Sequence, residues 1–570
     1  MARIAAARAR ALAVAAALQL ALVACAQKAD ATAPAAPPPE VTATAPAVTP
    51  PNIIFILADD LEADYKQDRL ALMPNLRRLR ASGVSFENHI ASIPLCGPSR
   101  GSLLSGRYAH NNGYRHNLDA ASIAAWRVIE NNTLGTWMTA AGYRTSYLGK
   151  YLNGLETTVP AGWNYYGGFD GIVGTYNYYS AQQFNVSFDD AGLQPTSPVA
   201  SVSRNGTHQA DFLGAQTVEL MSSAVARGQP FFVHVAPVMI HYGTCEGPFI
   251  DVLKYALTDP FWEMALQLFG CPNATANYHC NMEASPCVSQ RNAHAADGLT
   301  NPRTPAWDVT PSGGTPPSMQ LPPATAYEQQ RQDIAFRNRT GSALDLDDML
   351  GVILDGLAAL GPAVAANTYV VFTSDNGYHL NEHRLILGKE HPYTTDVRVP
   401  LYISGPGVPA NSTAAHPTTH VDLTATLVEL AGATPVGPPL DGLSFAAALT
   451  ATPVAPAAWR NFSYAENADD DTTWVQLRRP LAPAGAGDTA AATAFHWWCS
   501  NASEVFDLAA DPWQLANLAN STPRGAAIAL EALPLVLALA RCAGANCSAP
   551  TPLAVIPADP LSCYKTNRTI

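Results

Sequence analysis

Asn52-Ile53-Ile54-Phe55-Ile56-Leu57 is a continuous β-prone run, apolar from Ile53 onward, and Asp59-Asp60 follow it after one alanine. A continuous apolar run of this length is typical of a strand inside a parallel sheet, where both faces are buried. In parallel α/β sheets, ligands bind beyond the carboxyl ends of the strands. The run therefore predicts a central strand, with Asp59 and Asp60 at a functional edge.

Further apolar runs and helical patterns alternate along the chain. A helix is expected at residues 75–82, because Pro74 suits its first turn and Gly83 its end. Alternating buried strands and amphipathic helices predict an α/β sandwich with a mostly parallel sheet. The other expected strands are residues 145–148, 231–236, 369–374 and 401–404, and the other expected helices are 132–141, 208–227, 343–360 and 421–431.

Composition shifts suggest the boundaries of the parts. Residues 31–51 are rich in Ala, Pro and Thr and suit a flexible leader. Three further irregular segments stand out: a Pro-rich excursion on the surface at 301–325, a Pro-rich boundary at 434–439 and a loop at 480–492. We expect a signal peptide at 1–26, a leader at 27–51, a large domain at 52–435 and a smaller C-terminal α+β domain at 436–570.

The first residues resemble a secretory signal. Arg3, Arg8 and Arg10 precede a largely apolar run at 11–24, and Ala24-Cys25-Ala26 offers a cleavage site between small residues. A bacterial lipoprotein signal with lipid attached to Cys25 is the alternative. No later stretch has the roughly 18 consecutive apolar residues of a membrane span. We therefore expect no membrane association after signal cleavage.

Composition narrows the compartment and the partners. The formal net charge of -13 argues against a nucleic-acid binder, which carries a basic excess. Eight cysteines remain besides Cys25 and Cys96, an even number that suits disulfides. An oxidising route is therefore expected, leading outside the cell or to a cell-wall or periplasmic space, with a lysosome-like compartment as the alternative. Eleven glycosylation sequons also fit this route, at Asn131, Asn185, Asn205, Asn273, Asn338, Asn411, Asn461, Asn501, Asn520, Asn546 and Asn567.

The segment Cys96-Gly97-Pro98-Ser99-Arg100 carries the strongest chemical signal. Pro98 suits a first helical turn, so Cys96 is expected at a helix N-terminus, where free N–H groups and the helix dipole favour an anion. A buried structural cysteine ahead of a helix is the commoner alternative for an isolated Cys.

Two oxygen-rich pairs follow predicted strands: Asp59-Asp60, and Asp375-Asn376 ahead of Gly377. Carboxylate and amide oxygens at the same sheet edge suit a hard cation such as Ca²⁺. Taken singly, each pair is more often a turn or a helix cap.

The cysteine segment, extended through Leu104, Gly106 and Arg107, resembles the sulfatase signature C-x-P-S-R-x-x-x-L-x-G-R over its whole length. The resemblance covers roughly residues 52–520 and is closest to algal extracellular arylsulfatases and to N-acetylglucosamine-6-sulfatases. It implies an alkaline-phosphatase-like fold, with 52–435 as the catalytic domain. It also implies that Cys96 is converted to formylglycine by a formylglycine-generating enzyme, and that Ca²⁺ is held by Asp59, Asp60, Cys96, Asp375 and Asn376.

The same resemblance implies roles for basic residues. Arg100 lies one turn after Cys96, Lys150 and Lys389 match lysines that contact sulfate, and His241 matches a histidine that assists the leaving group. The sequence departs from the family at Leu152, where many sulfatases have a histidine that holds the formylglycine hydrate. Which residue takes this role here is left open. Further candidates for the pocket are His379 and His383 and, more weakly, His110 and Asn111, with surface or packing roles as an equal alternative.

The mechanism that the resemblance implies is attack on sulfur by one hydroxyl of the hydrated aldehyde, followed by expulsion of sulfate when the second hydroxyl is deprotonated. The predicted function is hydrolysis of small-molecule or glycan sulfate esters as an arylsulfatase, with N-acetylglucosamine-6-sulfatase as the alternative. A phosphatase or phosphodiesterase is less favoured, because those enzymes use Ser or Thr nucleophiles and often two transition metals. An inactive glycoprotein that binds sulfated polysaccharide is disfavoured by the intact Cys96 and its basic residues.

Overall fold

The computed structural model describes residues 50–556, except 64–68, 172–177, 179–180, 198–200, 205, 244–285, 317–318, 386, 450–458, 469–472 and 480–491. The expected signal peptide and nearly all of the expected leader lie outside the described residues, as does nearly all of the loop expected at 480–492.

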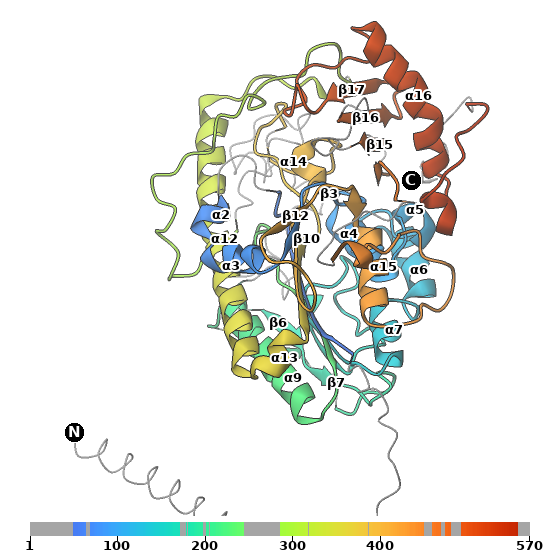
Figure 1. Ribbon diagram of the computed structural model, residues 1–570. Coiled ribbons are helices and arrows are strands. Elements are labelled where there is room, and N and C mark those ends of the chain that lie inside the picture. Colours follow the sequence, from blue (N-terminus) through green and yellow to red (C-terminus); the bar gives the residue numbers. More distant parts are fainter. Residues whose placement is uncertain are drawn as a thin grey trace, which may run out of the picture. The chain divides into compact units, whose positions relative to one another are not determined.

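A nine-stranded mixed sheet forms the centre of the unit that begins at Pro50 (Figure 1). Its middle strand is β1 (Asn52–Ala58), the run that opens the ordered chain, and every residue of β1 is buried. Parallel strands flank β1 on both sides, as expected for a continuous apolar run. The strand order is β12 (Ser412–Ala414), β2 (Val84–Phe86), β11 (Leu401–Ser404), β10 (Thr368–Ser374), β1, β9 (Phe231–Ala236), β4 (Arg144–Gly149), β5 (Tyr165–Gly168) and β7 (Val186–Ser187).

Helices cover both faces of this sheet (Figure 1). The side chains of β1 alternate between two apolar cores: Ile53 and Phe55 belong to one, and Ile54 and Ile56 to the other. The sandwich with a mostly parallel sheet is thus confirmed. One core includes side chains of α4 (Cys96–Ser105), α6 (Ala120–Ile129), α7 (Leu134–Ala140) and α15 (His420–Leu430), and the other includes side chains of α3 (Pro74–Ala81), α9 (Gln209–Ala226) and α12 (Ala326–Ala359).

The C-terminal part contains a four-stranded antiparallel sheet with one long helix beside it, which agrees with the smaller α+β domain expected there. The strands are β14 (Ser463–Asn467), β15 (Trp474–Arg479), β16 (Thr493–Trp498) and β17 (Ser503–Asp507), and the helix is α16 (Pro523–Leu539). A disulfide joins Cys542 to Cys547 just after α16.

Short elements complete the described chain. Two small two-stranded sheets pair β3 with β13 and β6 with β8. The elements are α2 (Arg69–Leu72), α5 (Ala109–Asn112), α13 (Pro362–Ala366), α14 (Thr394–Val397), β3 (His89–Ile90), β13 (Thr418–Thr419), β6 (Gln182–Phe184), β8 (Ser201–Ser203), η3 (Ala446–Leu449) and η4 (Gly544–Cys547).

The start of one helix in the middle of the chain was predicted too late. The helix expected at 343–360 is the second half of α12, which begins 17 residues earlier at Ala326 behind a capping box of Thr325 and Glu328. The segment 301–325 is irregular and most of its described residues are exposed or half-buried, as expected, although Ala306 and Met319 are buried and its backbone bonds to the loop 381–383 and to Leu515. This pairing satisfies backbone groups beside the buried residues of the segment.

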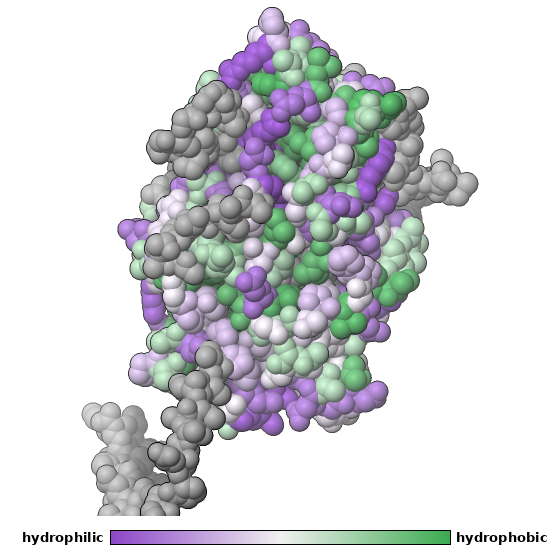
Figure 2. Space-filling view, turned by 45° about the vertical axis from the view of Figure 1, so that its right-hand side comes forward, coloured by the Kyte–Doolittle hydropathy of each residue, from purple (hydrophilic) through white to green (hydrophobic). Residues whose placement is uncertain are grey.

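None of the described helices combines the length and apolar character needed to cross a bilayer. In the face that Figure 2 displays, apolar and polar residues are intermixed.

Candidate active site

The carboxyl ends of β1 and β10 bring the two oxygen-rich pairs together. Ala58 pairs with Ser374, so Asp59-Asp60 and Asp375-Asn376 leave neighbouring strands at the same level. The Asp60 N–H donates to Asp375 Oδ1 at 3.1 Å, and Asn376 Nδ2 donates to Asp60 Oδ1 at 2.7 Å. All four side chains are buried. The sheet edge predicted from sequence is therefore a buried cluster of carboxylate and amide oxygens.

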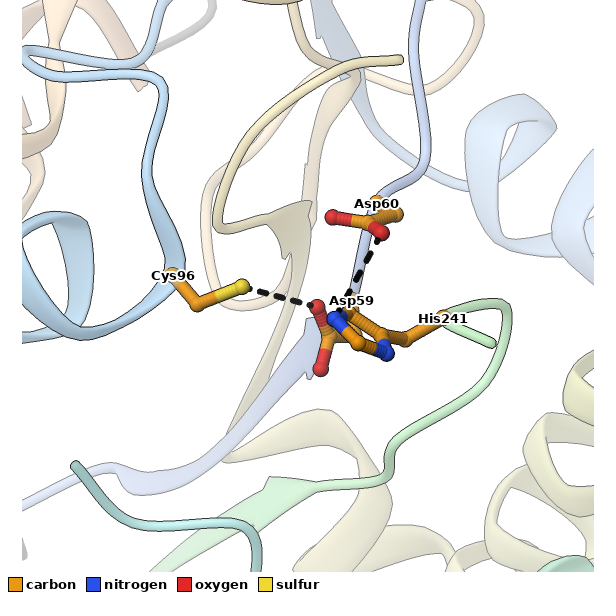
Figure 3. Close-up of side chains that lie close together, drawn as sticks. All are labelled: Asp59, Asp60, Cys96 and His241. Carbon is orange, nitrogen blue, oxygen red and sulfur yellow. Dashed lines mark hydrogen bonds and ion pairs between the residues drawn. The ribbon is translucent and has the colours of Figure 1, made fainter. Parts of the chain in front are cut away.

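Cys96 is the first residue of α4, after the extended N-cap residue Leu95. Its sulfur points toward Asp59, with 3.6 Å between Sγ and Oδ1 (Figure 3). Helix α4 ends at Gly106, whose φ of 65° is the left-handed conformation that glycine adopts without strain. The signature thus places Cys96 at a helix N-terminus, as expected, and against the acidic cluster.

Three cations surround the acids. Arg100 Nε donates to Asp375 Oδ2 at 2.9 Å, and Lys150 Nζ donates to Asp59 Oδ2 at 2.5 Å. Lys389 donates to Asp60 and also to Cys96 Sγ, the latter at 2.6 Å. The side chain of Lys150 is fully buried, and that of Lys389 is mostly buried. Two buried ammonium groups therefore lie beside Cys96, each paired with an aspartate.

Backbone contacts explain how Lys150 and His241 reach this place. The Lys150 N–H donates to the carbonyl of Ala236 at 2.7 Å. Gly149 ahead of it has a φ of 95°, and a Cβ there would lie 2.1 Å from the same carbonyl oxygen, so glycine is required. The loop after β9 runs along Asp59, whose carbonyl accepts from Ile240 N at 2.7 Å.

His241 faces the acids with one ring nitrogen. Its Nδ1 lies 2.9 Å from the carbonyl of Tyr242, so Nδ1 carries the proton in the neutral ring. Its Nε2 lies 3.9 Å from Asp60 Oδ2 (Figure 3). Burial lowers the pKa of His241 to about 4, although Asp59 and Asp60 oppose this shift. At neutral pH the ring is therefore neutral with Nε2 unprotonated, because Asp59 and Asp60 favour the imidazolium but do not outweigh burial.

The pKa values of Asp59 and Asp60 are shifted in opposite directions. Burial, followed by the neighbouring Asp375, raises the pKa of Asp59. Burial also acts on Asp60, but Lys389, His241 and Arg339 outweigh it and hold the pKa of Asp60 well below its usual value. Burial raises the pKa of the Cys96 thiol to about 12 despite Lys150 and Lys389 nearby. An unmodified Cys96 is thus a protonated thiol at neutral pH and a poor nucleophile.

The donor set fits a hard metal ion. Asp60 Oδ2 and Asn376 Oδ1 are buried and accept no hydrogen bond, and an unsatisfied buried acceptor costs about 1–3 kcal/mol. Both atoms belong to the two predicted pairs. Asp59, Asp60, Cys96 and His241 also offer ligand atoms within 4.8 Å of one another. Oxygens dominate the site, which favours Ca²⁺ or Mg²⁺ over a thiophilic metal.

The remaining positions singled out from the sequence lie elsewhere. Leu152 is buried in the apolar core, so its side chain adds no polar group to the cluster. His383 packs against the Tyr393 ring, with 4.0 Å between ring centroids. His110 bonds to Glu466, and Asn111 to Asp441, which ties α5 to the C-terminal part. His379 bonds to Asp396 through Nδ1 at 2.9 Å.

Sequence reasoning missed two residues at the site. Arg339 Nη2 donates to the carbonyl of Asp60 at 2.6 Å and to Glu62 at 2.7 Å, but it belongs to the half of α12 that was not predicted as helix. Tyr242 packs on His241 with 4.0 Å between ring centroids, and its phenol lies within electrostatic reach of Lys389 and Cys96. Only its position next to His241 could have indicated it.

Comparison with known families agrees with this geometry. The family model described as Sulfatase matches residues 51–433, which is most of the chain. The chain belongs to the sulfatase family. The resemblance of the Cys96 signature to sulfatases is thereby confirmed, and the enzyme is a sulfuric ester hydrolase.

Curated relatives include two kinds of sulfatase. The chain is 28% identical over 541 residues to an arylsulfatase of Volvox carteri, covering 88% of this chain and 76% of the relative. It is 27% identical over 416 residues to the N-acetylglucosamine-6-sulfatase of Homo sapiens, covering 69% of this chain and 63% of the relative.

Solved structures confirm the fold. One is a protein in complex with its substrate D-glucosamine-2-N,6-O-disulfate, with a TM-score of 0.59 and 20% identity over 85% of this chain and 95% of that chain. A phosphonate monoester hydrolase from Silicibacter pomeroyi has a TM-score of 0.56 and 20% identity, over 86% of this chain and 95% of that chain. The alkaline-phosphatase-like architecture expected from sequence is thus correct, and it is shared by sulfatases and a phosphonate ester hydrolase.

Proposed function

We propose that this sulfatase hydrolyses aryl sulfates with a formylglycine made from Cys96 and one calcium ion. The observation that carries the proposal is the position of Cys96: buried at the N-terminus of α4, 2.6 Å from Lys389 Nζ and 3.6 Å from Asp59. A protonated thiol there has little reactivity of its own. Formylglycine, once formed and hydrated, supplies a hydroxyl nucleophile together with a second hydroxyl that allows sulfate to be released.

Asp59, Asp60, Asp375 and Asn376 would hold the calcium ion, with the residue at position 96 as a further ligand. The unsatisfied Asp60 Oδ2 and Asn376 Oδ1 support this assignment. Calcium, when bound, supplies positive charge that favours the ionised nucleophile and polarises a sulfate oxygen. Arg100 keeps Asp375 oriented through its bond from Nε, and it lies 3.4 Å from Asp59.

Lys150 and Lys389 would bind the sulfate oxygens. Each ammonium pairs with an aspartate, Lys150 with Asp59 and Lys389 with Asp60. A sulfate group next to Cys96 gives both ammonium groups new anionic partners, and charge that develops in the transition state strengthens these contacts.

His241 would protonate the leaving oxygen, which requires that the negative charge of a bound sulfate ester first raise the pKa of His241 so that Nε2 takes up a proton. Nδ1–H is held by the Tyr242 carbonyl, so Nε2 is the nitrogen that faces the acids and the substrate. An alkyl alcohol is a poor leaving group and needs this proton, whereas a phenolate departs with little help.

The substrate class follows from the relatives. The two algal arylsulfatases match 88% of this chain, which favours small aryl sulfates. The second candidate is a 6-sulfated amino sugar, favoured by matches over 69% of the chain to N-acetylglucosamine-6-sulfatases of Capra hircus and Homo sapiens.

The chain organisation supports a secreted enzyme. Residues 1–26 would be the signal peptide, 27–51 a leader, 52–435 the catalytic domain and 436–570 the C-terminal subdomain. Maturation would need a formylglycine-generating enzyme in the secretory pathway. Extracellular sulfatases of Drosophila melanogaster and Caenorhabditis elegans are among the relatives, which supports this route, while the N-acetylglucosamine-6-sulfatases keep a lysosome-like compartment as the alternative.

The test is a panel of esters assayed with protein secreted from a eukaryotic host. We expect kcat/KM for a nitrophenyl sulfate to exceed that for N-acetylglucosamine 6-sulfate. If kcat/KM for N-acetylglucosamine 6-sulfate is higher by more than about tenfold, or about 1.4 kcal/mol, the second candidate is the function. Turnover of phosphate esters in preference to every sulfate ester would contradict both.

A further inference from the structure

Lys389 lies in a backbone segment that needs support. Gly388 before it has a φ of 154°, and Glu390 after it has a φ of 83°, which is unfavourable for a residue with a side chain. Such conformations persist only where tertiary contacts hold them. The Glu390 carbonyl accepts from Trp474 Nε1 at 2.8 Å and from Asn467 Nδ2 at 3.2 Å.

His379 holds the N-terminal side of Lys389. Its backbone forms an antiparallel bridge with Gly388, with His379 N donating to the Gly388 carbonyl at 2.8 Å. Its ring lies over the same residue, because a Cβ on Gly388 would be 3.2 Å from His379 Nε2. The buried imidazole therefore fixes the path of the chain into Lys389.

Asp396, on α14, holds both sides of Lys389 with one buried carboxylate. It accepts from His379 Nδ1 at 2.9 Å and from the His391 N–H at 2.9 Å. His391 in turn places Nδ1 at 3.0 Å from the Lys389 carbonyl, and Thr395 Oγ1 donates to Asp396 at 2.9 Å. Asp396 is thus linked to Gly388 through His379, and to His391 directly.

The same aspartate reaches the opposite side of the site. The carbonyl of Asp396 accepts from Gly377 N at 2.8 Å, directly after the proposed metal ligands Asp375 and Asn376. A Cβ at Gly377 would lie 2.0 Å from the Thr395 carbonyl oxygen, so α14 packs tightly against this turn.

We propose that Asp396 and His379 are positioning residues that fix the Lys389 ammonium relative to Cys96 and Asp60. The proposal deepens the proposed function, since it rests on Lys389 as a sulfate-binding residue. Neither side chain is hydrogen-bonded to Cys96 in the described part of the chain, so both act through Lys389. A displacement of about 1 Å in such a group is enough to cost roughly a hundredfold in rate.

His379, His391 and Asp396 also have the ligand types of a transition-metal site. Their hydrogen bonds favour the positioning role. Asp396 already accepts four donor contacts from three residues, and His391 Nδ1 is directed at the Lys389 carbonyl.

The experiment is a double-mutant cycle on the full chain. His379→Ala, His379→Asn and Lys389→Ala are assayed singly, and each His379 variant is combined with Lys389→Ala. The readouts are kcat and KM for a nitrophenyl sulfate, the inhibition constant of inorganic sulfate, bound zinc and the thermal midpoint. His383→Ala is the matched control, because His383 is equally buried in the same segment but packs on Tyr393.

We expect His379→Ala to lower kcat/KM at least about tenfold and to weaken sulfate inhibition. His379→Asn should recover most of this loss, since its amide nitrogen stands near the position of Nδ1. In the Lys389→Ala background, His379→Ala should add less than about twofold. His383→Ala should change the thermal midpoint without changing sulfate inhibition.

Three results would overturn the proposal. Losses from His379→Ala and Lys389→Ala that multiply would show that His379 acts independently of Lys389. Stoichiometric zinc that His379→Asn removes would replace positioning by a metal site. No effect of Lys389→Ala alone would refute the role of Lys389 in the proposed function, and the positioning role with it. If His379→Ala does not fold, the cycle of His379→Asn with Lys389→Ala tests the proposal instead. Losses that multiply in that cycle would again overturn it.

Discussion

Lys389 Nζ lies 2.6 Å from Cys96 Sγ, at the point where α4 begins. Burial disfavours the charged amine, but the pairing with Asp60 outweighs it and raises the pKa of Lys389 well above its usual value. Lys389 is therefore a permanent cation at the reacting position. This relationship joins two segments that are almost 300 residues apart in sequence.

Replacing this cation tests its role in binding sulfate. Lys389→Ala should lower kcat/KM for a nitrophenyl sulfate by about a hundredfold or more, because a preorganised charge next to the transferred group is lost. Arg78→Ala, which removes an exposed cation paired with Asp355, serves as the control and should leave the rate unchanged. Equal rates for both variants would exclude Lys389 from the site.

The metal assignment is tested by Asp375→Asn, which keeps the shape of the side chain and removes its charge. We expect loss of stoichiometric calcium, measured by elemental analysis after gel filtration, and a fall in kcat of about a hundredfold or more. Asp355→Asn, at an exposed position, is the matched control. Two zinc ions per chain in the active wild-type enzyme would contradict the single-calcium site.

His241→Ala separates leaving groups by their need for a proton. The rate with an alkyl sugar sulfate should fall by roughly 10²–10⁴, whereas the rate with nitrophenyl sulfate should fall much less. Measuring kcat/KM for both esters at one pH with wild type and variant gives the comparison. An equal loss for the two esters would rule out a role for His241 as the proton donor.

Outside the active site, His110 predicts a pH dependence of stability. Both ring nitrogens face acceptors, Glu466 Oε2 at 2.8 Å and the Cys542 carbonyl at 3.1 Å. Burial disfavours the charged ring, but Glu466 outweighs it and raises the pKa of His110. A raised folded-state pKa gives stabilisation that is complete below the unfolded value of about 6.5 and is lost as pH rises through the folded value.

Urea unfolding at a series of pH values checks this expectation. Wild type should lose stability relative to His110→Asn as the pH increases from about 6 upward. Parallel curves for the two proteins would show that His110 does not take up a proton on folding. Enzymatic rates need not change, because His110 joins α5 to the C-terminal part and does not belong to the acidic cluster.

Much of the fold could be predicted because its central strands are continuous apolar runs. β9 and β11 have the expected bounds, and β1 and β10 differ by one residue. The first half of α12 was missed because it is rich in polar and charged residues, several of which are buried by tertiary contacts. Arg339 is one of these, and its burial depends on Asp60 and Glu62, which are far away in sequence.

The candidate site could be predicted where a motif or a strand end marked the residue. Cys96, the aspartates and the two lysines meet as expected, whereas Asp396 lies in a short segment with no pattern of its own. The position of Asp396 depends on how α14 packs against the turn after Asn376, which a single sequence does not encode locally. Leu152 is buried in the apolar core, so it does not take the role that a histidine has at this position in many sulfatases.

Mass spectrometry of the active enzyme tests whether Cys96 is converted to formylglycine. The tryptic peptide that contains residue 96 should carry an aldehyde that reacts with a hydrazide probe, and the labelled fraction should rise in proportion to specific activity. Cys96→Ser should give a folded protein that becomes sulfated on the serine without turning over. Fully active enzyme with an unmodified thiol at Cys96 would contradict the account.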